Sequence, residues 1–398
     1  MAKRELLLLG TGWALVASNS GLISFALPLI AKEWALTGKQ TGLMLNLFLV
    51  GMLLGAFAFG RLADRIGRRP TAVLSLLILA LATAACSIAP NWVAMAALRL
   101  AAGMGATGYM VVASTLLTEL SPPEVRGRNV VILDSFWAYG WLFASLLGLA
   151  IAPSMGWRPV FLFGILPLFA APLLRLVPES QKFIEEVERV RLPVSTLFRG
   201  EYLRRTVMLW FHWFCIVMAY WGVFLWFPRV LVAQRGLSLV RSLQWSVLIT
   251  LAQLPGYWSG AVAVERLGRK VSLSLYMALA GLGALAYWYA ATPAQALAGA
   301  ITLSFFNLGA WGITYAYTPE LYPTSIRGLG AGAANSFGRV GGIIGPYLVG
   351  AILDSTGSYA LAFLTFAIVQ LASAAVVFGL GVETRGRPLE EISPEQAA

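Results

Sequence analysis

The sequence predicts an all-α integral membrane protein with twelve transmembrane helices arranged as two pseudo-symmetric bundles of six. Hydrophobic residues make up 59% of the 398 residues, charged residues only 12%, and the mean hydropathy is +0.75. A water-soluble domain would not keep so little polar surface. Twelve apolar runs approach or exceed the roughly 20 residues that cross the hydrocarbon core of a bilayer.

A repeat within the chain predicts that its two halves share one fold. Seven residues of the first half are Glu119, Leu120, Pro122, Arg126, Gly127, Ser135 and Phe136, and they recur 201 positions later as Glu320, Leu321, Pro323, Arg327, Gly328, Ser336 and Phe337. The same offset carries Arg65, Gly67 and Arg68 onto Arg266, Gly268 and Arg269. A constant offset across separate motifs is typical of a duplicated membrane unit.

The spans follow from the apolar runs in chain order. The first begins like a signal peptide, but its uncharged run continues to Ile30, which is too long for a cleaved segment. The predicted spans cover residues 6–31, 41–61, 70–89, 92–118, 129–152, 156–177, 205–232, 241–263, 271–291, 294–317, 329–352 and 359–380. We therefore expect an N-terminal bundle over 1–177 and a C-terminal bundle with a short cytoplasmic tail over 205–398.

The longest break in hydropathy, residues 178–204, predicts a cytoplasmic linker between the bundles. Phe183, Val187 and Val190 share one helical face among charged residues, which indicates an interfacial helix.

The basic residues are distributed unevenly across the predicted topology. With both termini in the cytoplasm, 20 of the 29 lysines and arginines lie inside, six lie outside, and Arg99, Arg175 and Arg339 fall within spans. This is the positive-inside pattern, so the net charge of +11 reports topology and not a nucleic-acid partner. We expect a multi-pass protein of the cytoplasmic (inner) membrane, acting as a monomer in the lipid bilayer.

Nothing in the sequence indicates a cofactor, a metal or an enzyme. Cys86 and Cys215 sit in different predicted helices, His212 is the only histidine, and the predicted spans hold no acidic dyad within one helical turn.

Several motifs resemble those of the major facilitator superfamily. GRLADRIGRR at 60–69 resembles its signature loop, ERLGRK at 265–270 is a weaker copy, and the paired E-x6-R segments begin at Glu119 and Glu320. VPES at 177–180 and VETRGRPLEE at 382–391 resemble motifs of its sugar, organic-ion and niacin branch. DSFWAYGW at 134–141 and YWGVFLWFP at 220–228 are most similar to bacterial niacin transporters. The resemblance implies alternating access around a site between the bundles, near the membrane midplane.

Charged residues at the cytoplasmic helix ends are candidate gate residues. They are Asp64, Arg65, Arg68, Glu119, Arg126, Glu265, Arg266, Arg269, Glu320 and Arg327. Ion pairs among them could hold the inner face closed and would separate when it opens. For any single member, an equally plain reading is that it satisfies a helix end or sets topology.

Arg339 is the predicted anion-binding residue. It lies twelve residues beyond Arg327, about 18 Å along a helix and therefore near the midplane. Asn335 precedes it by one turn on the same face. A guanidinium group offers paired hydrogen bonds to a carboxylate. The alternative is a structural ion pair between Arg339 and Asp134.

Asp134 is the predicted proton-coupling residue, because it is the one acidic residue well inside a span, and Trp137 follows on its face. The alternative is a permanent ion pair with an arginine. The niacin-transporter pattern has acidic residues in the first span, where this chain has Val16 and Asn19. Asn19 and Ser20 can bind a ligand but cannot carry a proton, so facilitated diffusion stays an alternative to symport.

Aromatic and amide side chains supply the other substrate-binding candidates. They are Tyr220, Trp221, Phe224, Asn307, Trp311, Tyr315, Gln253 and Tyr257. Asn307, Trp311 and Tyr315 recur every four residues, which predicts that they share one helical face. Rings, amides and an arginine suit a small planar aromatic acid, although most such aromatic residues in spans pack against lipid or neighbouring helices.

The predicted function is secondary transport of a small organic anion, nicotinate-like, with proton coupling as one mode. An organic cation bound through Asp134, or a sugar, is the alternative substrate. A membrane receptor that binds without transporting is the alternative from a different class.

Overall fold

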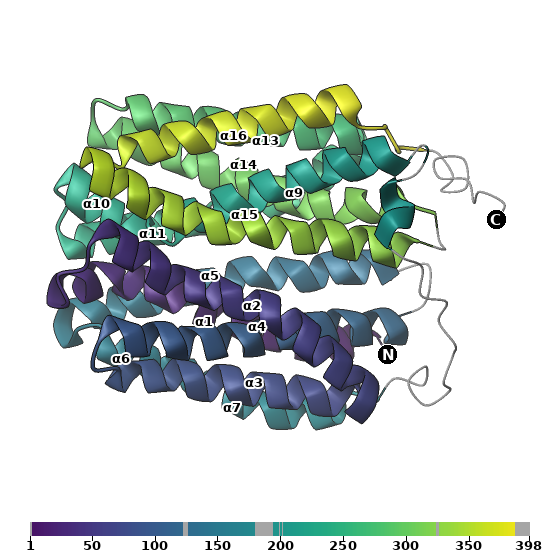
Figure 1. The fold of residues 1–398 in the computed structure, drawn as a ribbon, viewed down its shortest axis with the longest axis horizontal. Helices are drawn as coiled ribbons and strands as arrows, with labels where there is room; N and C mark the ends of the chain where they lie inside the picture. Colours follow the sequence, from purple (N-terminus) through teal and green to yellow (C-terminus); the bar gives the residue numbers. More distant parts are fainter. Residues whose placement is uncertain are drawn as a thin grey trace. The chain divides into compact units, whose positions relative to one another are not determined.

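The computed structural model describes residues 2–121, 126–179, 194–198, 200, 202–323 and 326–386, and within these ranges every regular element is a helix (Figure 1). Twelve segments are long and apolar enough to span a membrane, as the hydropathy predicts. The fold class is therefore an all-α membrane protein of twelve spans.

The helices follow the predicted spans closely. In the first half they are α1 (Ala2–Glu33), α2 (Gly38–Ile66), α3 (Arg68–Ala85), η1 (Cys86–Ile88), α4 (Trp92–Leu120), α5 (Arg126–Met155), α6 (Arg158–Leu162), η2 (Phe163–Ile165), α7 (Leu166–Ala170) and η3 (Ala171–Leu176). In the second half they are η4 (Val194–Phe198), α9 (Tyr202–Phe224), α10 (Phe227–Arg235), α11 (Leu239–Leu251), α12 (Gln253–Leu267), α13 (Arg269–Tyr289), α14 (Pro293–Glu320), α15 (Arg327–Thr356) and α16 (Ala360–Leu380).

Proline accounts for the places where a predicted span is not one continuous helix. The predicted span 205–232 ends as α9 at Phe224, and α10 restarts with Pro228 in its first turn. The eighth span is divided into α11 and α12 at Ala252, and Pro255 follows. Proline lacks the backbone N–H that would continue the hydrogen-bond ladder. The sixth span, containing Pro159, Pro167 and Pro172, is likewise a chain of short α and 3-10 segments.

The predicted interfacial helix lies mainly in residues 180–193, outside the described residues, as does the end of the tail, 387–398. Contacts divide the chain into two compact units. The first unit holds Met1–Glu188, Phe224–Thr250 and Pro346–Gly357, and the second holds Arg189–Val223, Leu251–Gly345 and Ser358–Ala398. The predicted bundle boundaries, 1–177 and 205–398, stay a prediction drawn from the sequence repeat.

Glycine allows α2 and α4 of the first unit to cross at backbone contact. A Cβ atom on Gly103 of α4 would lie 2.0 Å from the carbonyl oxygen of Phe48, and one on Gly51 of α2 would lie 2.0 Å from that of Leu100. Small residues at such crossings permit close helix packing in membranes.

Replacing Gly103 with alanine is therefore expected to destabilise the protein by about 1–3 kcal/mol, because the two backbones must separate. Gly60→Ala is the matched control, since a Cβ atom there meets nothing within 4 Å and alanine favours a helix. Thermal unfolding in detergent should show a lower midpoint for Gly103→Ala and an equal or higher one for Gly60→Ala. Equal midpoints in the two variants would contradict this account of the crossing.

Candidate functional site

Aromatic rings from α9 and α14 form a continuous wall in the second unit. Tyr220 contacts Trp221 and Trp311, with ring centroids 5.4 and 5.2 Å apart. Trp213 meets Trp311 at 6.1 Å and Tyr315 at 5.2 Å, both edge to face. Such offset and edge-on contacts are the favourable geometries for aromatic pairs. We call these five rings, Trp213, Tyr220, Trp221, Trp311 and Tyr315, the aromatic wall.

The amide of Asn335 on α15 joins this wall, because its Nδ2 donates to the Tyr315 hydroxyl at 3.3 Å. Arg339 follows one turn later on α15, and both side chains are only partly buried. Helix α15 reaches α9 through small residues, since a Cβ atom on Gly342 would lie 3.2 Å from the Trp221 ring. The second unit thus assembles rings, an amide and a helix that carries the predicted anion-binding arginine.

Hydrogen bonds from Trp213 and its neighbour His212 fix α9 against adjacent helices. The Trp213 indole donates to Thr318 at 3.0 Å. Thr314 donates its hydroxyl hydrogen to the Ala310 carbonyl, so it accepts from His212 Nε2 at 2.8 Å, and His212 Nδ1 then accepts from Ser373 at 2.8 Å. His212 is fully buried. These bonds tie α9, α14 and α16 together. Trp213 is not among the residues that the sequence predicts to bind substrate, although it lies seven residues before Tyr220.

The other substrate-binding candidates of the second unit, Tyr257, Gln253 and Asn307, each have different neighbours. The Tyr257 ring packs on α14, because a Cβ atom on Gly312 would lie 3.0 Å from it. Gln253, at the start of α12, is fully buried, and its amide has no hydrogen-bond partner among the described residues. Asn307 donates to Gln370 of α16 at 3.0 Å. Its amide therefore contacts the helix behind α14.

In the first unit, α5 carries the buried residue Asp134 and, further along, two buried tryptophans. Asp134 is 4% exposed and Trp137 is 7% exposed. Further along α5, Trp141 packs edge to face on Phe25 at 6.0 Å and on Phe224 at 6.5 Å. The predicted candidate Phe224 thus belongs to the first unit, with α1 and α5. A buried acidic residue within a membrane span is costly and is therefore a functional-site hypothesis.

Asn19 and Ser20 are buried, and their side chains donate to carbonyls of their own helix, at Leu15 and Val16. Their main-chain carbonyls accept from the Arg99 guanidinium at 2.9 and 3.1 Å. Arg99 is 1% exposed, and its guanidinium carbon lies 4.1 Å over the Phe48 ring. Arg99 therefore fixes the middle of α1, a role that the hydropathy pattern could not assign.

The candidate gate residues pair between neighbouring helices of the same unit. Arg68 lies 3.7 Å from Glu119 in the first unit, and Arg269 lies 3.1 Å from Glu320 in the second. Arg327 donates to the Tyr322 carbonyl. The charged side chains Arg65, Glu265 and Arg266 are exposed. The side chains of Asp64 and Arg126 lie outside the described part of the structure. The gating role stays a prediction.

Two glutamates that carried no predicted role cap helix starts. Glu179 accepts from the backbone N–H groups of Arg68 and Arg69 at 3.1 and 3.0 Å. Glu383 does the same for Arg269 and Lys270, at 2.8 and 3.2 Å. Carboxylates are stabilising at a helix N-terminus, where backbone donors lack partners. The signal was present in the motifs VPES and VETRGRPLEE, whose glutamates follow the last span of each half.

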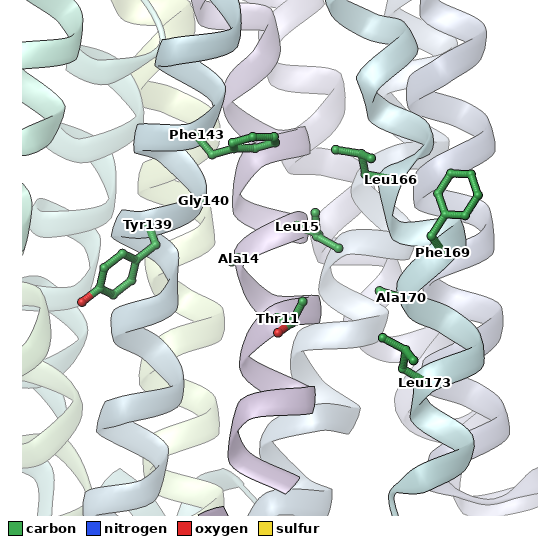
Figure 2. Close-up of a pocket in the computed structure, with 10 residues that line it drawn as sticks. All are labelled: Thr11, Ala14, Leu15, Tyr139, Gly140, Phe143, Leu166, Phe169, Ala170 and Leu173. Atoms are coloured by element: carbon green, nitrogen blue, oxygen red, sulfur yellow. The ribbon is translucent and has the colours of Figure 1, made fainter. Parts of the chain in front are cut away.

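A cavity of about 400 Å³ opens between α1, α5 and the sixth span (Figure 2). Its lining is apolar except for Thr11 and Tyr139. Figure 2 shows Leu15, Phe143 and Leu166 projecting from the three facing segments. The substrate-binding candidates are all absent from its lining, so this cavity is separate from the candidate site.

Twelve membrane-spanning segments, with aromatic, amide and charged side chains among their helices, are typical of polytopic secondary transporters. The Major Facilitator Superfamily model matches residues 9–316 and 260–397. The chain belongs to this superfamily and is a transporter, not an enzyme.

Two relatives and one solved structure illustrate the similarity. The chain is 40% identical to the "Niacin transporter NiaP" of Acinetobacter baylyi, covering 96% of this chain and 94% of the relative. It is also 40% identical to the "Putative niacin/nicotinamide transporter NiaP" of Bacillus subtilis, covering 98% of each. The xylose transporter XylE from E. coli superimposes with a TM-score of 0.80 at 16% identity, covering 98% of this chain and 99% of XylE. The XylE likeness shows the fold.

Proposed function

We propose that the protein carries nicotinate, or a closely similar small aromatic carboxylate, across the cytoplasmic membrane by alternating access. The main support for the proposal is the contact between the aromatic wall and α15. Tyr315 of the wall accepts a hydrogen bond from Asn335, which lies one helical turn before Arg339. The two relatives named as niacin transporters support the same substrate class.

Each part of the proposed site has a chemical task. The faces and edges of the wall stack on a planar ring. The Arg339 guanidinium gives a carboxylate two parallel charge-assisted hydrogen bonds, which a neutral amide substrate cannot match. Asn335 contributes further polar contacts near the same turn. The buried and partnerless amide of Gln253 is a candidate for a second polar contact, because a buried amide is costly without a partner.

Competition binding tests the substrate class. Labelled nicotinate is bound to purified protein and displaced with unlabelled nicotinate, nicotinamide, benzoate and a quaternary organic cation. The proposal expects displacement by the two carboxylates and weak displacement by nicotinamide. Displacement by the cation alone would overturn the proposal in favour of a cation site at Asp134.

The wall itself is tested by Trp311→Ala, which removes the ring that joins Tyr220 to Tyr315 in the wall. We expect nicotinate affinity to fall about tenfold, and Trp311→Phe to retain most of it, because a ring of similar placement remains. Trp258→Ala is the control, since Trp258 is 65% exposed on α12. Equal affinity in Trp311→Ala and the parent would remove the wall from the site.

We propose that Asp134 is the proton-coupling residue, that both termini are cytoplasmic, and that the protein works as a monomer. The buried position of Asp134 within α5 supports the first part. The excess of lysine and arginine in the segments assigned to the cytoplasm supports the second. The third follows from each half contributing its own helices to a single transport path.

A further inference from the structure

At the start of α2, two backbone N–H groups have no acceptor within the helix and are bound by a residue distant in the sequence. Thr37 is the N-cap, its side chain accepts from Gln40, and its carbonyl accepts from Thr41. These bonds satisfy the third and fourth N–H groups of the helix. The first two, on Gly38 and Lys39, have no partner within the helix, as at any helix start.

Asp354, near the end of α15, supplies the missing acceptors. Its Oδ1 accepts from Gly38 at 2.6 Å, and its Oδ2 accepts from Lys39 at 2.8 Å. The carboxylate thus takes one donor with each oxygen, at the positive end of the α2 dipole. All of these residues belong to the first unit, although Asp354 comes from the second half of the sequence.

Close backbone contact brings α2 and α15 together at this point. A Cβ atom on Gly38 would lie 2.4 Å from the Gly350 oxygen, and one on Gly350 would lie 2.1 Å from the Gly38 oxygen. Gly42, one turn further along α2, packs in the same way on the backbone of Pro346 and Tyr347. No side chain fits between the helices here, so the carboxylate and the donors stay in register.

A second set of hydrogen bonds, made by Arg229, lies beside the Asp354 contact. Arg229 of α10 donates to the Leu36 carbonyl at 3.2 Å and to the Thr41 hydroxyl, and its guanidinium carbon lies 5.3 Å over the Trp226 ring. The Trp226 indole in turn donates to the Pro346 carbonyl at 3.1 Å. In Figure 1, α10 and α11 lie at the same end as the turn between α1 and α2.

We propose that Asp354 and Arg229, with the start of α2, form an outer latch that holds the extracellular ends of the two halves together. Alternating access requires this end to open, so the latch must break in each cycle. It therefore sets the balance between the states that are closed and open to the outside. The inference goes beyond the substrate proposal and rests on the orientation with both termini inside.

Thiol labelling from outside the cell tests the latch without any substrate. The reporter is Ser24→Cys, because Ser24 is fully buried and its hydroxyl donates to the Phe224 carbonyl at 2.7 Å in the closed arrangement. Labelling by a membrane-impermeant maleimide is then followed by mass spectrometry, residue by residue. Lys32→Cys, at an exposed position on the same end, verifies the orientation.

Asp354→Asn is expected to raise the labelling rate of the Ser24→Cys reporter roughly tenfold, because a neutral amide cannot hold both donors as a charge does. Glu33→Gln is the matched control. Glu33 is a carboxylate at the same end, but it pairs with Arg158 at 2.8 Å and with the Trp157 indole at 2.6 Å, inside the first half. It should leave the rate unchanged.

The two native cysteines separate latch opening from general loosening. Cys86 and Cys215 are both buried in the structure and should stay unlabelled in every variant. An unchanged reporter rate in Asp354→Asn would overturn the latch, as would an equal rise in Glu33→Gln. A parallel rise at Cys86 or Cys215 would also overturn it, by showing that the whole protein had loosened. Arg229→Gln should also raise the labelling rate of the Ser24→Cys reporter, because it removes the hydrogen bonds of Arg229 to Leu36 and Thr41.

Discussion

Arg339→Ala should lose nicotinate binding by roughly a hundredfold while the protein remains folded. Two charge-assisted hydrogen bonds to a carboxylate are worth about 3 kcal/mol together, and that energy corresponds to the stated loss of affinity. Arg339→Lys should recover only part of it, because an ammonium group cannot make the paired contact. Titration of purified protein with labelled nicotinate measures both variants.

Arg175→Ala is the control for Arg339→Ala. Arg175 also falls within a span, but its side chain is exposed on η3, so the variant changes the net charge equally without touching the proposed site. Affinity in Arg339→Ala that matches the Arg175→Ala value would remove the anion-binding role from Arg339. Nicotinamide affinity serves as a second check, because it should be the same in the parent, in Arg339→Ala and in Arg175→Ala.

Asp134→Asn should abolish accumulation of nicotinate driven by an inward proton gradient while exchange across the membrane continues. An asparagine keeps the size of the side chain but cannot carry a proton, so the loaded protein can still reorient without being coupled to the gradient. The measurement compares accumulation with exchange of labelled for unlabelled nicotinate in vesicles.

The contrary outcome for Asp134 is also informative. Accumulation equal to that of the parent would exclude Asp134 from coupling. Loss of both accumulation and exchange would place it instead in the binding site or in a structural ion pair. Asn19 and Val16 occupy the first-span positions where acidic residues are expected from the niacin-transporter resemblance, so Asp134 is the residue on which symport depends in this account.

Hydropathy and the repeat predicted the twelve spans because burial in a bilayer is imposed on whole segments. They did not predict the break after Phe224 or the division at Ala252. Pro228 and Pro255 signalled both, but apolar runs continue across them. Hydropathy averages over a window, whereas a proline breaks the helix at one residue.

Periodicity predicted which aromatic residues share a face but not what that face contacts. Trp311 and Tyr315 do join one wall, whereas Asn307 pairs with Gln370. A spacing of four residues drifts by about 40° per step on a helix of 3.6 residues per turn. The two steps from Tyr315 back to Asn307 rotate the side-chain direction by about 80°, and Asn307 contacts Gln370 of α16. The grouping of Trp213 with these rings needed the tertiary structure, because α9 and α14 lie almost a hundred residues apart.

Asp354 shows the same limit for charged residues. Its partners lie 315 and 316 residues earlier in the chain, and they are backbone groups that leave no mark in a sequence. The glycines at 38, 42 and 350 are a local trace of the contact. Pairings between distant helix ends become visible only when the ends are placed in space.

Nicotinate transport is tested by uptake of labelled nicotinate into vesicles that contain the folded protein. It is measured with and without an inward proton gradient, and in competition with nicotinamide and an organic cation. We expect saturable uptake that another aromatic carboxylate inhibits, and accumulation above equilibrium only when the gradient is present. Absence of nicotinate uptake in vesicles that take up the organic cation or a sugar would contradict this expectation.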